Sequence, residues 1–214
     1  MKTKKISIIF PIILIVLSFV VTLYFYPQMP SQIATHWGPG GEVDGYSSKA
    51  FGLFFMPVLS VFLFFLFISL PKIDPYKKNF DQFKNYFQSF INLIFAFFFY
   101  IYLITIIWNL GFRFNMIQIL SPAFAVLFYY AGVLMLHAKQ NWFVGIRTPW
   151  TMSSVTVWNK THQIGGKLFK LVALLSLLSL AFPQYAIFFI LIPVLFVTVF
   201  VFAYSYIEFK KTVI

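Results

Sequence analysis

Two polar stretches interrupt an otherwise apolar sequence, and both hold side chains that could do chemistry. In the first, PSQIATHWGPGGEVDGYSSKA, an imidazole (His36) lies near two carboxylates (Glu42 and Asp44). Such a set could ligate a divalent metal ion or transfer protons. Its spacing matches no metal-binding signature, and the turn signals around Gly41 and Asp44-Gly45 favour a compact, turn-rich cap in which Asp44 caps a turn. We keep a metal site here as the alternative.

Arg147 is the centre of the second stretch, NWFVGIRTPWTMSSVTVWNKTHQIGG. Its planar guanidinium can bind a carboxylate or a phosphate through two hydrogen bonds. Asn141, Thr148 and Thr151 stand close enough in sequence to complete such a cradle. The alternative is that Arg147 is an anchor lying on lipid phosphates. The residues alone do not decide between these two roles.

The aromatic residues of the second stretch, among them Trp150 and Trp158, indicate order, because such side chains are buried or lie at the level of the lipid headgroups. Ser153 or Ser154 can cap a helix here. Trp158 and His162 share one face of that helix. We predict an interfacial amphipathic helix that leads into the next membrane span.

The composition indicates a membrane protein. Of the 214 residues, 61% are hydrophobic, 22% are aromatic and only 10% are charged. So few polar residues cannot cover the surface of a soluble globule. The chain has no cysteine, which excludes disulfides and thiolate metal sites.

Uncharged runs predict six membrane spans, because a helix crosses the ~30 Å hydrocarbon core in about 20 residues. The last run is long enough for two helices, and Pro183-Gln184 marks the turn between them. The spans are expected at about residues 6–26, 51–70, 87–110, 118–136, 167–182 and 186–207. The fifth is short, so a tilted or half-membrane element is the alternative there. The first follows the basic sequence MKTKK without a cleavage signal, and we expect a retained helix.

The basic residues orient these spans, because Lys and Arg collect on the cytoplasmic side of a membrane. With six spans, 14 of the 16 Lys and Arg residues fall on one side, and only Lys49 and Arg113 fall on the other. We therefore expect both termini in the cytoplasm, the first polar stretch outside the cell and the second inside. The net charge of +11 then reflects topology and contact with anionic lipid, and we expect no nucleic acid partner.

No predicted span carries Lys, Arg, Asp or Glu near its middle. Ion-coupled transporters place ionisable residues there, so this pattern disfavours a transporter, whereas a lipid or peptide handler needs no such charge. We divide the chain into an N-terminal two-span unit, residues 1–84, and a C-terminal four-span unit, residues 85–214. The expected fold class is an all-α membrane protein without a cofactor.

Together, the two stretches resemble the SdpI family, which are membrane immunity proteins against a sporulation-delaying toxin and carry an N-terminal domain of unknown function. The outer stretch is similar at Pro30, His36, Gly38, Gly41, Asp44, Gly45 and Lys49. The inner stretch is similar at Asn141, Gly145, Arg147, Thr148, Trp150, Thr151, Ser154, Trp158, Thr161 and His162. Both motifs occur in the family's order, and with the spans between them the resemblance covers nearly the whole chain.

The resemblance implies immunity to a membrane-active toxin peptide outside and, as in the family's founding system, recruitment of a cytoplasmic transcriptional regulator inside. It implies no catalytic residues, so an enzyme is not expected. The candidate binding residues are, inside, Asn141, Arg147, Thr148, Trp150, Thr151, Trp158 and His162 and, outside, His36, Gly41, Glu42, Asp44 and Lys49. A membrane-embedded enzyme, or a lipid- or solute-handling protein using either stretch, is the alternative function.

Overall fold

The computed structural model describes residues 8–213, and within them six helices are long and apolar enough to cross a membrane. They are α1 (Ile9–Phe25), α2 (Lys49–Ile73), α3 (Lys77–Asn109), α4 (Met116–His137), α6 (Val155–Ser176) and α8 (Leu191–Val213). The predicted all-α membrane fold with six spans is confirmed. Lys2, Lys4 and Lys5, on which part of the predicted orientation rests, lie outside the described residues.

Shorter elements join the long helices. The single-turn helices and the hairpin strands are η1 (Tyr26–Gln28), β1 (Gln32–Trp37), β2 (Val43–Ser48), α5 (Pro149–Ser153), η2 (Leu177–Leu180), η3 (Pro183–Tyr185) and α7 (Ala186–Phe189). The two strands pair antiparallel between α1 and α2. The last three elements turn the chain from α6 into α8.

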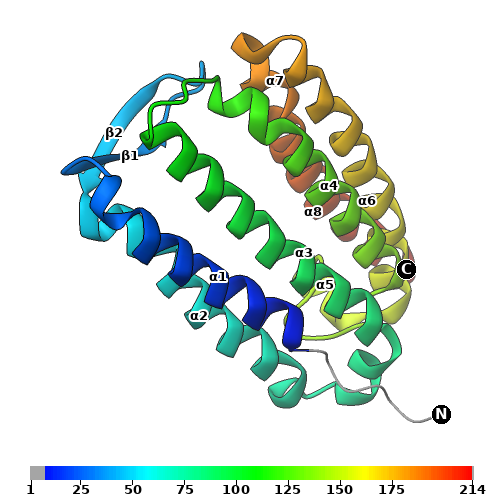
Figure 1. The fold of residues 1–214 in the computed structure, drawn as a ribbon. Coiled ribbons are helices and arrows are strands. Elements are labelled where there is room, and N and C mark those ends of the chain that lie inside the picture. Colours follow the sequence, from blue (N-terminus) through cyan, green and yellow to red (C-terminus); the bar gives the residue numbers. More distant parts are fainter. Residues whose placement is uncertain (1–7, 214) are drawn as a thin grey trace.

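The long helices form two groups of three (Figure 1). α1, α2 and α3 pack against one another, while α4 packs against α6, and α6 against α8. Contact between α3 and α4 joins the two groups. The β1–β2 hairpin covers one end of the bundle, which we call the hairpin end, and the connection between α4 and α6 lies at the opposite end.

α4 and α6 pack backbone against backbone. A Cβ atom at Gly132 of α4 would collide with the carbonyl oxygen of Gly166 in α6, and one at Gly166 would collide with that of Gly132. Small residues at a contact allow membrane helices to approach this closely. The pair fixes α6, and with it the polar residues of its first turns, against the end of α4.

The fifth span differs most from its prediction. α6 begins at Val155 and not near residue 167, and with η2 it extends to Leu180 as a full-length span. Ser154 caps it, because its side-chain oxygen accepts the backbone N–H of Val157. The predicted separate interfacial helix is therefore wrong. The polar residues before Lys167 form the first turns of the spanning helix. Thr161 and His162 are buried against the protein, whereas Asn159, Lys160 and Gln163 are exposed.

α3 also begins earlier than predicted, at Lys77 and not near residue 87. The charged residues from Lys77 to Lys84 continue the helix beyond its apolar run. The division placed between residues 84 and 85 falls inside this helix.

The outer stretch is a β-hairpin, whereas a turn-rich loop was predicted. Pairing of the strands satisfies backbone N–H and C=O groups that an irregular loop would leave without partners. The register shifts on both sides of His36, and Gly41 adopts φ = +88° in the turn. Asp44 lies within β2, so the prediction that it caps a turn is also wrong.

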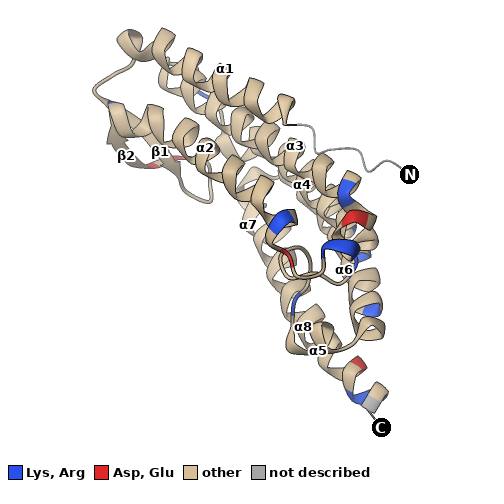
Figure 2. Cartoon of the chain, turned by 90° about the horizontal axis from the view of Figure 1, so that it is seen from below, with Lys and Arg blue, Asp and Glu red and all other residues tan. Residues whose placement is uncertain are grey.

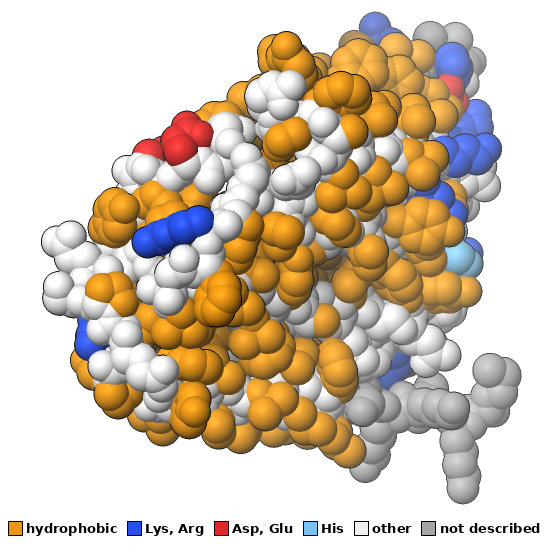
Figure 3. Space-filling model, turned by 45° about the horizontal axis from the view of Figure 1, so that its top comes forward, with side chains coloured by type: hydrophobic (Ala, Val, Ile, Leu, Met, Phe, Trp, Pro, Cys, Tyr) orange, Lys and Arg blue, Asp and Glu red, His pale blue; other side chains and the backbone are white. Residues whose placement is uncertain are grey.

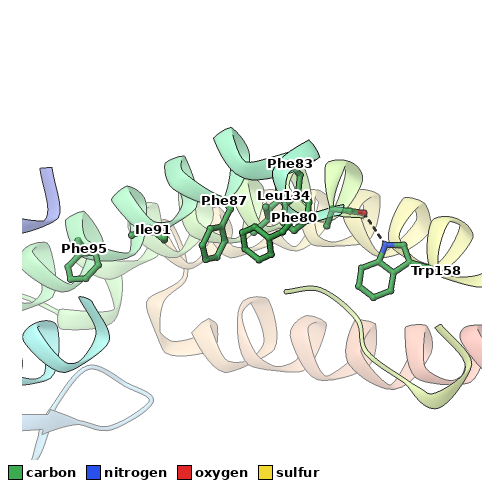
Figure 4. Packing of buried hydrophobic residues seen from close by; sticks show 8 residues of the cluster. Phe80, Phe83, Phe87, Ile91, Phe95, Leu134 and Trp158 are labelled. Carbon is green, nitrogen blue, oxygen red and sulfur yellow. Dashed lines mark hydrogen bonds between the residues drawn. The ribbon is translucent and has the colours of Figure 1, made fainter. Parts of the chain in front are cut away.

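An aromatic core fills the end opposite the hairpin (Figure 4). Phe80, Phe83, Phe87, Ile91 and Phe95 follow one face of α3 at intervals of three or four residues, and all are buried. The same cluster contains residues from α4 and the first turns of α6, namely Leu134, Ala138 and Trp158.

Charge is distributed unevenly along the bundle. Figure 2 shows that Lys and Arg gather at the end opposite the hairpin, which we call the basic end. Hydrophobic side chains cover most of the surface between the two ends (Figure 3). This arrangement matches a protein whose middle lies in lipid and whose ends meet water or headgroups.

Candidate functional site

The α4–α6 connection, residues 138–154, ties several helices together at the basic end. Asn79 of α3 donates from its side chain to the carbonyl of Gln140, at 2.9 Å. Trp158 of α6 donates its indole N–H to the carbonyl of Ala138, also at 2.9 Å (Figure 4). The hydroxyl groups of Thr148 and Ser205, the latter in α8, lie 3.0 Å apart. The connection is thus a packed part of the structure.

Asn141 sets the path of this connection. It is buried, and its amide group donates to the carbonyls of Lys139 and Val144. Its side-chain oxygen accepts the backbone N–H groups of Phe143 and Val144, at 2.9 and 2.6 Å. These four bonds use the whole hydrogen-bonding capacity of the side chain, so Asn141 has none left for a ligand.

Thr148 and Thr151 cap α5 and do not form the predicted cradle with Arg147. Each side chain accepts the other's backbone N–H, at 2.9 and 3.2 Å, in a capping box. The Thr151 hydroxyl also donates to the carbonyl of Ile146, at 2.8 Å. Arg147 itself is exposed and donates to the carbonyl of Trp142. The guanidinium is therefore an accessible charge of this connection, as is the exposed Lys139, but it lacks the neighbouring ligands that the sequence suggested.

Trp150 anchors α5 to the last helix. Its ring lies 5.1 Å from that of Phe202 and 4.9 Å from that of Tyr206, both in α8. Contacts of this kind add to the apolar area that the ring buries.

His162 is a structural histidine. It is buried, it stacks on Trp158 with 3.9 Å between ring centroids, and its Nε2 accepts the backbone N–H of Ile146 at 2.9 Å. Nδ1 lies 2.9 Å from the carbonyl of Trp158, so Nδ1 carries the proton and the ring is neutral. Gly145, at φ = +112°, passes so close that a Cβ there would collide with Nε2. With both nitrogens occupied, His162 is not free to bind a metal or move a proton.

A small polar pocket of about 190 Å³ lies beside His162. Its other polar side chains are Lys139, Asn159 and Gln163, and all three are exposed. A cation with two amides is a set that suits an anionic group.

Sequence reasoning missed Asp74, the most buried carboxylate at the basic end. Its oxygens accept the backbone N–H groups of Tyr76 at 2.6 Å and Trp142 at 3.0 Å. Asp74 therefore joins the α2–α3 turn to the α4–α6 connection. The Asp74-Pro75 dipeptide indicates a turn, but it gives no sign of the bond to Trp142.

At the hairpin end, His36 and Asp44 are brought together and Glu42 is not. Nδ1 of His36 contacts a carboxylate oxygen of Asp44 across the strands, and both side chains are exposed. The Glu42 carboxylate lies against Gly38 and Gly40 in the turn instead. In residues 8–213 no group of three or more His, Asp or Glu side chains is placed to hold a metal ion. The geometry thus gives no support to the alternative metal site.

Gly41 and Lys49 have structural contacts. A Cβ at Gly41 would collide with the side chain of Asn115, which donates to the carbonyl of Gly40 at 2.8 Å. Lys49, the first residue of α2, donates to the carbonyl of Tyr26 at 3.2 Å and lies over that ring.

A single polar side chain, Asn109, docks the hairpin on α3. It accepts the backbone N–H of Ala34 at 2.8 Å and donates to the carbonyl of the same residue at 3.1 Å. Trp37 meets Trp108 edge to face, and the guanidinium of Arg113 lies over the Trp108 ring. Sequence reasoning missed Asn109, because a neutral side chain within a span gives no sign of a partner far away in the chain.

Two family models match this chain. A domain of unknown function, DUF1648, matches residues 13–61, which contain the hairpin, and the SdpI/YfhL protein family matches residues 137–206, which contain the α4–α6 connection. Residues 137–206 therefore carry the sequence pattern of the SdpI/YfhL family. It is 27% identical over 204 residues to the immunity protein SdpI of Bacillus subtilis (strain 168), an alignment that covers 95% of this chain and 96% of the relative. No solved structure matches the chain.

The polar stretches within the two matched segments lie at opposite ends of the bundle, although the SdpI/YfhL segment also contains α6 and most of α8. The DUF1648 segment supplies the hairpin with His36 and Asp44, and the SdpI segment supplies Arg147, Trp158 and His162. The family resemblance of the two polar stretches is confirmed, and the binding roles of their residues stay a prediction.

Proposed function

We propose that this protein protects the cell that makes it against a membrane-active toxin peptide. The observation that carries the proposal is the similarity, over 95% of the chain, to a protein named as an immunity protein. The six apolar helices and the bilayer-matched distribution of charge support it, because such a protein meets the toxin in the membrane where the toxin acts. Toxin contact is part of the proposal.

The test is survival. Cells that lack their own immunity protein are exposed to a sporulation-delaying toxin peptide with and without this chain. We expect survival only with the chain. Cells that express it at the level of a working immunity protein in the membrane and still die would contradict the proposal.

We further propose that the basic end faces the cytoplasm and the hairpin faces outward. The gathering of Lys and Arg at one end supports this orientation. The absence of cysteine from the sequence makes a direct test possible. In intact cells a membrane-impermeant maleimide should label Glu42→Cys and not Ser153→Cys, and permeabilised cells should show both. The reverse pattern would invert the topology.

Arg147 is the residue that we propose for signalling to a cytoplasmic regulator. It is exposed beside Trp142, which is also exposed, and its charge suits an acidic partner surface. We expect Arg147→Ala to retain protection and to release a tagged transcriptional repressor from the membrane, while Lys139→Ala serves as a matched control. Equal loss of both functions at unchanged protein abundance would contradict this role.

A further inference from the structure

The polar pocket beside His162 lies where the end of α4 meets the first turns of α6. Leu136 and Lys139 line it from the α4 side, and Asn159 and Gln163 line it from α6. An interval of four residues places both amides on one face of α6. The pocket has a volume of about 190 Å³ and a largely polar lining, whereas two larger pockets at the hairpin end are mostly apolar. It is therefore suited to a small polar group.

The amide side chains at the basic end fall into two groups. Those of Asn79, Gln140 and Asn141 donate to backbone carbonyl groups and hold the α4–α6 connection in place. Those of Asn159 and Gln163 are exposed, line the pocket and make no hydrogen bond within residues 8–213. Their NH₂ groups are therefore available to a ligand.

Lys139 gives the pocket a positive charge that no carboxylate neutralises. Within residues 8–213, the ion pairs at the basic end join Glu208 to Lys160 and to Lys211, and Lys139 is in neither. Its ammonium group donates three hydrogen bonds and accepts none. A cation beside amide donors suits a ligand with several anionic oxygens, and lysine is a common phosphate ligand in proteins.

A second lysine lies on the same face of the α4–α6 pair. Lys170 follows Gln163 by seven residues on α6, and its ammonium group lies 5.2 Å from the ring centre of Tyr129, which precedes Leu136 by seven residues on α4. Two helical turns on each helix place this pair roughly 10 Å from the pocket, toward the middle of the bundle. Because α6 begins at Val155, Lys170 lies within the spanning helix. An ionisable side chain there points to a partner.

Beyond Lys170 the same face of α6 becomes apolar. Leu174 and Leu177 follow at intervals of four and three residues, and 63% and 39% of their surfaces are exposed. The order along this face is a polar pocket, a lysine and then exposed leucines. A phospholipid has the same order, since its phosphate-bearing headgroup is followed by acyl chains. Basic pockets between spanning helices bind anionic headgroups in this way.

We propose that the pocket beside His162 binds a phosphate group, held by the ammonium group of Lys139 and the amides of Asn159 and Gln163. An anionic phospholipid and free phosphate share this chemistry. The order of residues along α6 favours the phospholipid, whose acyl chains then lie on the exposed leucines beyond Lys170. The proposal goes beyond the proposed function, because neither the toxin nor the regulator enters it.

Native mass spectrometry of the delipidated full-length protein tests the site. The probes are phosphatidylglycerol and a diacylglycerol with the same acyl chains, which lacks the phosphate. We expect several-fold more protein–lipid adduct with phosphatidylglycerol. Lys139→Ala and Gln163→Leu should each reduce that adduct several-fold, whereas Lys139→Arg, which keeps the charge, should retain most of it.

Matched controls remove the same groups from α3 at the same end of the bundle. Lys78→Ala and Gln82→Leu should leave phosphatidylglycerol binding unchanged, because neither residue lines the pocket. The substituted side chains are all exposed, so we expect every variant to fold with the thermal midpoint of the wild type. Equal loss of binding in Lys78→Ala and Lys139→Ala would overturn the proposal, since lipid would then follow the total charge of the basic end.

Calorimetric titration with inorganic phosphate separates the two sources of the phosphate group. For a phospholipid we expect no saturable heat in the millimolar range, and a weaker phosphatidylglycerol adduct in Lys170→Met. Saturable heat that Lys139→Ala abolishes, without a preference for phosphatidylglycerol over the diacylglycerol, would assign the same pocket to free phosphate. Neither saturable heat nor a preference for phosphatidylglycerol would overturn the proposal.

Discussion

The two ends of the molecule use their polar residues in opposite ways. At the basic end, polar side chains such as Asn141, Thr151 and His162 are buried and hydrogen-bonded within the connection. At the hairpin end, His36 and Asp44 are exposed, and Asn109 makes the attachment to α3. One end is a buried network joined to several helices, and the other is an appended cover.

The contrast shows that polarity in a membrane protein does not by itself mark a binding surface. The connection at the basic end looks like a ligand site in sequence because it is rich in donors and acceptors. In the structure most of them satisfy one another, since unpaired buried polar groups are costly. Exposure separates Arg147 from Asn141, Thr148 and Thr151, which are buried.

The largest expected effect comes from Gly145→Ala at the basic end. A methyl group there collides with Nε2 of His162 at a positive φ, so we expect a loss of at least roughly 3 kcal/mol of stability, or failure to fold. Gly111→Ala is the matched control, because Gly111 has φ = +108° with no atom near its Cβ position, and should cost only about 1–2 kcal/mol. The measurement is the thermal midpoint of each variant in detergent. An equal loss of stability in the two variants would show that the contact between Gly145 and His162 is loose.

Asp74→Asn should have the next largest effect. The amide oxygen can accept one of the two backbone N–H groups, but the amide NH₂ faces the other as a second donor. We expect roughly 2 kcal/mol of destabilisation. Asp81→Asn on the exposed side of α3 is the control and should leave the thermal midpoint unchanged. An Asp74→Asn variant with the thermal midpoint of the wild type would show that the connection does not depend on this carboxylate.

Asn109→Ala should destabilise the hairpin end and leave the basic end unchanged. Removal of the amide releases Ala34, and we expect about 1 kcal/mol of local destabilisation for each lost bond. Hydrogen exchange should speed up in residues 32–48 and stay unchanged in residues 138–154. Faster exchange at both ends would mean that the hairpin is coupled to the basic end, against the comparison drawn above.

His36→Ala should have the smallest effect. The pair with Asp44 is exposed and screened by solvent, and such pairs are worth about 0.5 kcal/mol or less. We expect a thermal midpoint close to that of the wild type. A clear drop would show that the hairpin depends on this pair.

The sequence predicted the spans well where hydropathy alone decides them. All six were expected, because long uncharged runs have no other stable arrangement in lipid. The beginnings of α3 and α6 were placed too late, since charged and polar residues there continue helices that extend beyond the apolar run or face the protein. Ser154 was one of two expected caps, and it is the one used.

The site was harder to predict, because its polar groups pair over long separations in the chain. Asp74 bonds to Trp142, and Asn109 bonds to Ala34. Neither pairing has a local sequence signal. The hairpin was not predicted because its strands are short, β2 contains glycine and serine, and the register is irregular at His36.

The length of α3 has a further consequence. Its 33 residues rise about 50 Å, well beyond the ~30 Å of hydrocarbon. The turns that carry Phe80 and Phe83 therefore reach toward water, where burial of apolar rings is driven by the solvent, whereas helices inside lipid gain nothing from leaving it. Packing of this end is therefore driven by water, and packing of the spanning helices takes place in lipid. Urea, which acts through water, should loosen the Phe80–Trp158 cluster while the lipid-embedded helices stay intact.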